Sequence, residues 1–136
     1  MDLPDNIQEW IKEDEGLRLH PYLDTTGHVT IGWGRNLDNG ISHDEAQLMF
    51  NNDYARTLSE LGALDWYINL PNGVKNALIN MNFNLGISKL LQFTHMIEAL
   101  KKKDFTAASI AALNSAWCKQ VGQRAHDIAA VIRQGR

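Results

Sequence analysis

Residues 15–33 limit the fold more than any other part of this 136-residue chain. Apolar residues stand at odd positions on both sides of a Thr25-Thr26-Gly27 turn signal: Leu17, Leu19 and Leu23 before it, and Val29, Ile31 and Trp33 after it. Alternation with a period of two around a turn predicts a β-hairpin whose odd positions pack inward. The even positions, including Asp24 and Thr30, should then face out together. As near or diagonal cross-strand neighbours, with Cβ atoms roughly 5 to 8 Å apart, these two side chains could hold a water molecule between them.

Glu15 should approach the hairpin from a preceding helix. Ile7, Trp10 and Ile11 have the i, i+3, i+4 spacing that predicts a short helix. Asp5 or Asn6 can cap its start, and Gly16 is typical of the position just beyond a helix end. Glu15 is therefore predicted to be the last side chain of that helix. Carboxyl groups at the negative end of a helix dipole hold their proton more tightly, which suits a general acid.

The rest of the chain predicts helices to its end. Ser42 with Glu45 three residues later is a capping box, and residues 71–86 have helical apolar spacing. Thr94 and Asp104 can cap two further helices. The pattern indicates an α+β fold, with a small N-terminal antiparallel hairpin or sheet lobe joined by a helix to a larger C-terminal helical lobe.

Length and composition fit one compact domain over residues 1–136, with an N-terminal lobe at about residues 12–53 and a C-terminal lobe at about residues 60–136. We expect the N-terminal helix to pack on the C-terminal lobe. Cys118 is the only cysteine, so no internal disulfide can form, and its thiol is expected to be buried. No metal or organic cofactor is expected, because the five histidines lack metal-ligand spacing.

Charge is distributed unevenly along the chain. Residues 1–69 hold four Lys or Arg against thirteen acids, whereas residues 70–136 hold nine against three. An overall acidic balance without an aromatic-rich basic strand argues against nucleic acid as the partner. The apolar runs are too short for stable membrane insertion, and the acidic start, Met1-Asp2-Leu3-Pro4-Asp5, is unlike a signal peptide. We therefore expect a cytoplasmic protein.

Specific motifs resemble one enzyme family over nearly the whole chain. The run Asp14-Glu15-Gly16-Leu17-Arg18-Leu19, followed by Tyr22, Asp24-Thr25, Gly27, Thr30-Ile31-Gly32 and Gly34, is similar to the active-site hairpin of the phage-type lysozymes, glycoside hydrolase family 24. Segments within residues 40–53, 77–94, 115–117 and 124–135 resemble that family in the same order. The resemblance implies a monomeric endolysin that cleaves β-1,4 bonds between N-acetylmuramic acid and N-acetylglucosamine in bacterial peptidoglycan. It also implies storage in the host cytoplasm until a separate holin opens the way to the periplasmic wall.

The resemblance also assigns roles to individual residues. Glu15 would protonate the leaving oxygen, while Asp24 and Thr30 would position and activate a water on the opposite face, with inversion. Each has an ordinary alternative: Asp24 as a turn former and Thr30 as a strand former. The substrate-binding residues implied are Phe83, Asn84, Trp117 and Arg124. Phe83 and Trp117 could equally be core aromatics, and Arg124 is expected beside Glu15.

One ion pair is expected from the same resemblance. Arg35 stands where a relative has a histidine that pairs with an aspartate of the connecting helix, and Asp53 matches that aspartate. We predict that Arg35 and Asp53 pair, although two unrelated surface charges remain an alternative.

Two other functions remain open at this point. A lytic transglycosylase would use the same acid without an activated water, so Asp24 and Thr30 weigh against it. A non-catalytic peptidoglycan-binding module could dispense with Glu15.

Overall fold

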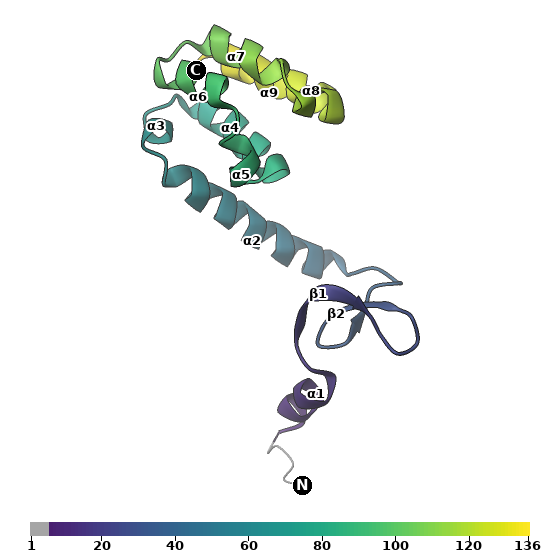
Figure 1. The fold of residues 1–136 in the computed structure, drawn as a ribbon. Helices are drawn as coiled ribbons and strands as arrows, with labels where there is room; N and C mark the ends of the chain where they lie inside the picture. The colour runs from purple at the N-terminus through teal and green to yellow at the C-terminus, as the bar shows by residue number, and fades with distance from the viewer. Residues whose placement is uncertain (1–5) are drawn as a thin grey trace. The chain divides into compact units, whose positions relative to one another are not determined.

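The computed structural model describes residues 6–136 and confirms an α+β fold. The elements in chain order are α1 (Ile7–Glu15), β1 (Arg18–Leu23), β2 (Val29–Gly32), β3 (Arg35–Asn36), α2 (His43–Gly62), α3 (Asp65–Ile68), α4 (Asn72–Leu85), α5 (Ile87–Leu90), α6 (Thr94–Lys101), α7 (Phe105–Leu113), α8 (Ala116–Val121) and α9 (Gln123–Gln134) (Figure 1). The chain divides into two compact units, Met1–Leu48 and Met49–Arg136. Strands occur in the first unit, and helices make up the second.

Helix α1 begins and ends where its sequence predicts. The Asn6 side chain accepts a hydrogen bond from the Glu9 amide at 2.8 Å, which caps the first turn. Asp5, the other candidate cap, lies outside the described residues. Gly16 follows the last helical residue, and its amide donates to the Lys12 carbonyl at 2.8 Å. Glu15 is therefore the last residue of α1, as predicted.

The three strands form one antiparallel sheet in the order β1-β2-β3. In the first pair Tyr22 lies opposite Thr30, and in the second pair Thr30 lies opposite Asn36. The register of β1 against β2 shifts between Arg18 and Tyr22, which marks a bulge. Thr30 therefore sits on the central strand with a neighbour on each side.

The predicted inward packing of the odd positions is wrong. Leu19 and Leu23 are 74% and 68% exposed, whereas Thr30 at an even position is only 3% exposed. Three short strands and one nine-residue helix provide too little structure to cover an apolar sheet face. No residue of α1 is buried, so among residues 6–48 the helix supplies no core.

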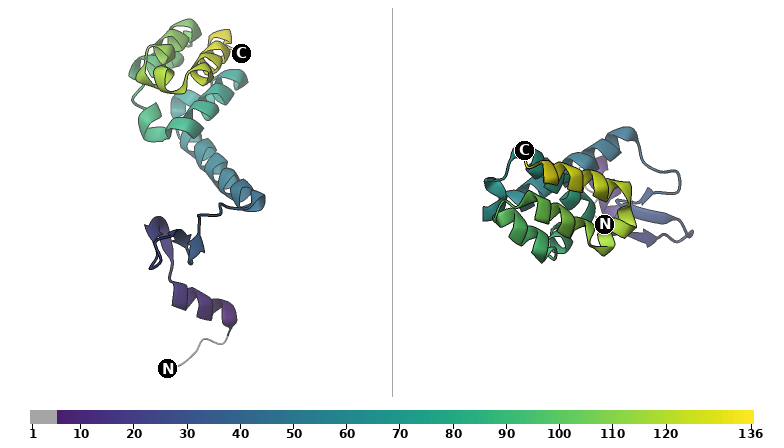
Figure 2. Two further views of the ribbon diagram at one scale, coloured as in Figure 1. Left: turned by 90° about the vertical axis from the view of Figure 1, so that its right-hand side faces the viewer. Right: turned by 90° about the horizontal axis from the view of Figure 1, so that it is seen from above.

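The hydrophobic core of the described residues lies in the second unit. Its buried residues come from the end of α2, from α3, α4 and α5, and from the later helices: Leu61, Tyr67, Leu70, Val74, Ala77, Leu78, Met81, Leu90, Met96, Ile97, Leu100, Ala108, Ala112, Trp117, Ala125, Ile128 and Ile132. Helix α4 contributes with the i, i+3, i+4 spacing of one helix face. Helix α9 runs alongside α7 and α4, as the views in Figure 2 show.

Most helix boundaries predicted in this unit agree with the structure. Pro71 and Gly86 flank α4, and the Asp104 side chain caps α7 by accepting from the Ala107 amide at 3.1 Å. The predicted Thr94 cap is wrong, because Phe93 occupies the cap position of α6 and Thr94 is its first helical residue. Within residues 6–136, none of the helices has the length and apolar character that crossing a bilayer requires.

Candidate active site

Glu15 lies against the turn between β2 and β3. A Cβ atom added to Gly34 would stand 2.8 Å from the Glu15 Cδ atom and closer still to Oε2. The carboxyl group therefore occupies the space that only a glycine leaves free. One helical turn earlier, the Lys12 Nζ atom lies 4.6 Å from the ring centroid of Trp33, a cation–π distance. These two contacts attach the end of α1 to the turn at residues 33–34.

Asp24 closes the turn between β1 and β2 with one of its two carboxylate oxygens. Its Oδ1 atom accepts from the amide and hydroxyl of Thr26, both at 2.9 Å, and from the amide of His28 at 2.8 Å. These bonds, led by the one from His28, lower the pKa of Asp24 below its ordinary value, so the side chain is a carboxylate at neutral pH. No hydrogen bond to Oδ2 comes from the described residues, which leaves that oxygen available to solvent.

Thr30 is joined to Asp24 through the backbone of His28. The Thr30 hydroxyl donates to the His28 carbonyl at 2.9 Å, and the Asp24 amide donates to the same carbonyl oxygen at 2.9 Å. Asp24 and Thr30 are thus diagonal neighbours across the β1–β2 ladder, as the sequence predicts. Because its hydrogen points to the carbonyl, the Thr30 oxygen keeps its lone pairs for another donor.

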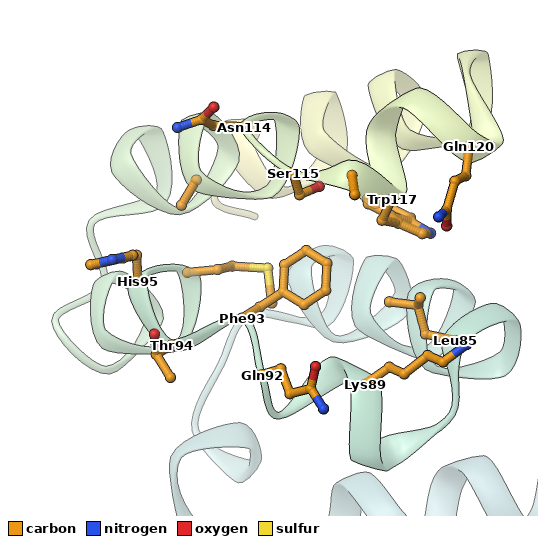
Figure 3. A pocket seen from close by; sticks show the side chains of 13 residues that line it. Leu85, Lys89, Gln92, Phe93, Thr94, His95, Asn114, Ser115, Trp117 and Gln120 are labelled. Carbon is orange, nitrogen blue, oxygen red and sulfur yellow. The ribbon is translucent and has the colours of Figure 1, made fainter.

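The four predicted substrate-binding residues form two pairs in the second unit. Trp117 and Asn84 are one pair: the Trp117 Nε1 atom donates to Asn84 Oδ1 at 2.8 Å, and Trp117 is only 3% exposed. The Trp117 ring meets Phe93 edge to face at 6.0 Å, and both line a cavity of about 440 Å³ (Figure 3). Polar side chains of Lys89, Gln92 and other residues surround its mouth.

Phe83 and Arg124 line a different cavity, of about 530 Å³. Arg124 is held there by Asn80, whose Oδ1 atom accepts from Arg124 Nε at 2.9 Å and from Nη2 at 2.7 Å. Phe83 packs against Phe50, with ring centroids 5.4 Å apart. The expected position of Arg124 beside Glu15 stays a prediction. The pairing of Arg124 with Asn80 could not be predicted from the sequence, because a pairing across 44 residues leaves no local signal.

Each member of the expected Arg35–Asp53 ion pair has a partner within its own unit. Arg35 pairs with Glu45, the same residue that closes the Ser42 capping box. The Asp53 Oδ1 atom lies 3.1 Å from Arg56 Nη2. The Arg35–Asp53 pair would join the two units and stays a prediction.

Other groups that could carry chemistry are few among residues 6–136. No cluster of three or more His, Cys, Asp or Glu side chains is arranged in this range to hold a metal ion. Cys118 is partly exposed rather than buried as predicted, and its Sγ atom lies 3.8 Å from His126 Nε2. The polar groups at the hairpin are therefore the best candidate for a catalytic centre.

Comparison with known proteins identifies relatives over most of the chain. The family described as phage lysozyme matches residues 12–134. A probable T4-type lysozyme of Dictyostelium discoideum is 28% identical over 96% of this chain and 95% of its own length. The pre-baseplate central spike protein Gp5 of Enterobacteria phage T4 is 26% identical over 96% of this chain but only 28% of its own length. An endolysin of Acyrthosiphon pisum secondary endosymbiont phage 1 is 26% identical over 84% of this chain and 80% of its own length.

Proposed function

Because the chain belongs to the phage lysozyme family, we propose that it hydrolyses the β-1,4 bond between N-acetylmuramic acid and N-acetylglucosamine in bacterial peptidoglycan. Its general activity, without regard to the exact bond cleaved, is that of a lysozyme-like glycosidase of the cell wall. One observation carries the finer proposal: a single three-stranded sheet holds Glu15 at one turn and the Asp24–Thr30 pair at the other.

The proposed roles follow from what each group can donate or accept. Glu15 gives its proton to the glycosidic oxygen as the bond to the sugar breaks. Thr30, whose hydroxyl is bound to the His28 carbonyl beside Asp24, helps to position the attacking water. The Oδ2 atom of Asp24 takes the proton of that water as it adds to the anomeric carbon. No cofactor enters these steps.

We propose that the reaction inverts the anomeric configuration. Inverting glycosidases need their carboxyl groups about 6.5 to 9.5 Å apart, because a water must fit beside the sugar. Asp24 and Glu15 are held at opposite ends of strand β2 (Val29–Gly32), Asp24 at the turn to β1 and Glu15 at the turn to β3, so the two carboxyl groups are not neighbours on one turn. A retaining enzyme would instead need its two carboxyl groups about 5 Å apart.

We propose that Phe83, Asn84, Trp117 and Arg124 form the substrate-binding surface: Phe83 and Arg124 contact the glycan directly, and the nearly buried Trp117 with Asn84 supports the wall of the other cavity. Aromatic faces and planar polar groups are suited to sugar rings and amides, and the two cavities described above present both kinds of group. Asn84 acts through the indole of Trp117, which it holds in place.

The biological setting belongs to the proposal as well. By analogy with the endolysin among its relatives, we propose that the protein acts as a monomer in host cell lysis, waiting in the host cytoplasm until a holin admits it to the periplasmic wall. Expression in a bacterial host with and without a holin tests this setting: lysis should require both proteins. Lysis by this chain alone would contradict the dependence on a holin.

The activity is tested by digesting purified peptidoglycan and analysing the new ends. The parent protein should release reducing ends in the inverted anomeric form, detected by NMR before mutarotation. Glu15→Gln and Asp24→Asn should each lose about 100-fold or more in rate, while Glu13→Gln, a change at a neighbouring acid on the same helix, should not.

Three outcomes would contradict the proposal. Anhydromuramic ends would indicate a lytic transglycosylase. Binding to the wall without any cleavage would indicate a peptidoglycan-binding module. Full activity of Glu15→Gln would show that the acid is assigned to the wrong residue.

A further inference from the structure

The backbone of His28 is the point where the two residues of the proposed water site meet. Its amide donates to Asp24 Oδ1 at 2.8 Å. Its carbonyl accepts both from the Asp24 amide and from the Thr30 hydroxyl, each at 2.9 Å. A shift of the two peptide groups that flank the His28 Cα atom would therefore move the partners of the Asp24 carboxylate and of the Thr30 hydroxyl together.

The side chain of His28 is tied to a separate part of the same unit. Its Nδ1 atom lies 2.5 Å from the Oδ2 atom of Asp38, which belongs to the connection between β3 and α2. Asp38 is itself fixed, because its amide donates to Asn36 Oδ1 at 2.8 Å and the amide of Leu37 donates to the Val29 carbonyl at 2.8 Å. The His28–Asp38 pair therefore connects the β1–β2 turn to a segment that is itself hydrogen-bonded to the sheet.

We propose that His28 is a positioning residue for the hydrolysis: held by Asp38, it fixes the backbone amide and carbonyl that orient Asp24 and Thr30. This inference rests on the function proposed above. Exposed ion pairs contribute little to stability, so the expected role of the pair is geometric. His28 would thus act in addition to Glu15, Asp24 and Thr30, the three residues proposed to touch the substrate or the water.

A pH dependence follows from the charges around the imidazole. Two carboxylates face it, Asp38 from the β3–α2 connection and Asp24 from the β1–β2 turn. The hydrogen bond and charge of Asp38, with a smaller effect of Asp24, raise the pKa of His28 above its ordinary value. We call the ion pair between His28 and Asp38 the clamp. It is fully formed at low pH, where the imidazole is charged, and it weakens as the pH rises through the raised pKa of His28.

Activity against purified peptidoglycan, measured from about pH 5 to 9, tests the clamp. In the parent, kcat/KM should fall on the alkaline side at the pKa of His28, read separately from its imidazole protons by NMR. Asp38→Asn should move that fall to lower pH, because removing the carboxylate removes the main cause of the raised pKa. His28→Asn offers Asp38 only a neutral donor, as the deprotonated imidazole does, so it should lose this pH dependence and keep about the activity that the parent has at high pH.

Two further variants complete the series. His28→Ala removes the clamp and should lose about tenfold in kcat/KM at all pH values. His20→Ala changes another exposed histidine of the same hairpin, on β1, and serves as the matched control that should behave like the parent.

A second measurement does not depend on catalysis. The backbone amides of Thr26 and Thr30 should change their NMR shifts together with His28 in the parent, and should not do so in His28→Ala. An alkaline fall that stays in place in Asp38→Asn, or hairpin amides that ignore the titration of His28, would overturn the inference. If the parent releases no reducing ends at any pH, the proposed function fails, and the amide shifts alone decide whether the clamp exists.

Discussion

Replacing Gly34 with alanine should separate the position of Glu15, the proposed catalytic acid, from the stability of the fold. The added methyl group would lie 2.8 Å from the Glu15 Cδ atom, whereas carbon atoms pack at about 3.5 to 4.0 Å. The Glu15 carboxyl group must therefore move by about 1 Å. A displacement of that size in a reacting group costs about 100-fold in rate, so we expect kcat/KM to fall by about that factor.

Alanine at position 34 would also destabilise the fold, because the backbone there has a positive φ. Gly32→Ala serves as a control for this effect. Gly34 has φ of +75°, and Gly32 has φ of +70° on the other side of Trp33, but a methyl group on Gly32 would meet nothing within 4 Å. A left-handed backbone costs a residue with a side chain about 1 to 2 kcal/mol. Gly32→Ala and Gly34→Ala should therefore lose similar amounts of unfolding free energy.

The two variants are compared by urea unfolding and by release of reducing ends from purified peptidoglycan. Only Gly34→Ala should lose activity beyond what its stability explains. If Gly34→Ala is as active as Gly32→Ala, the Glu15 carboxyl group does not work from the position seen against Gly34, and the argument for its role fails.

Three further outcomes test other parts of the structure. Asn84→Ala leaves the buried indole N–H of Trp117 without its acceptor, so the unfolding free energy should fall by about 1 to 3 kcal/mol; an unchanged urea midpoint would contradict this. Leu78→Ala opens a cavity at a position with no solvent exposure and should cost about 2 to 5 kcal/mol, whereas a loss below 1 kcal/mol would mean that the core collapses around it. The pKa of Glu45 is lowered, first by the hydrogen bond from the Ser42 amide. Because the folded value lies below the unfolded one, this carboxylate stabilises the fold above its unfolded pKa and stops doing so as the pH falls through the folded value. The loss of stability between about pH 6 and pH 3 should therefore be smaller in Glu45→Gln than in the parent, and an equal loss would refute the assignment.

Features that depend on neighbours in sequence were predictable. The Asn6 cap, the end of α1 at Glu15, the Ser42–Glu45 capping box and the Asp104 cap were all anticipated, because each depends on groups within four residues of one another. The one wrong cap, Thr94, was misplaced by a single residue.

Features that depend on which strands and helices meet were not predictable in the same way. The contact of Glu15 with Gly34 and the pair of His28 with Asp38 join residues separated by turns of the chain. The alternation of apolar residues predicted a hairpin but not its burial or the bulge in β1, because burial depends on what covers each face.

The sequence by itself determined where α1, α4 and the hairpin turn lie and which residues are candidates for the chemistry, since those follow from short-range hydrogen bonds and from residue types in a specific motif. Only the tertiary structure decided that Glu15 lies against Gly34, that one oxygen of Asp24 is occupied while the other is open, and that His28 joins Asp24 to Thr30. These arrangements arise from strand pairing and packing, and a linear pattern does not encode the direction in which a side chain points once the chain has folded back on itself.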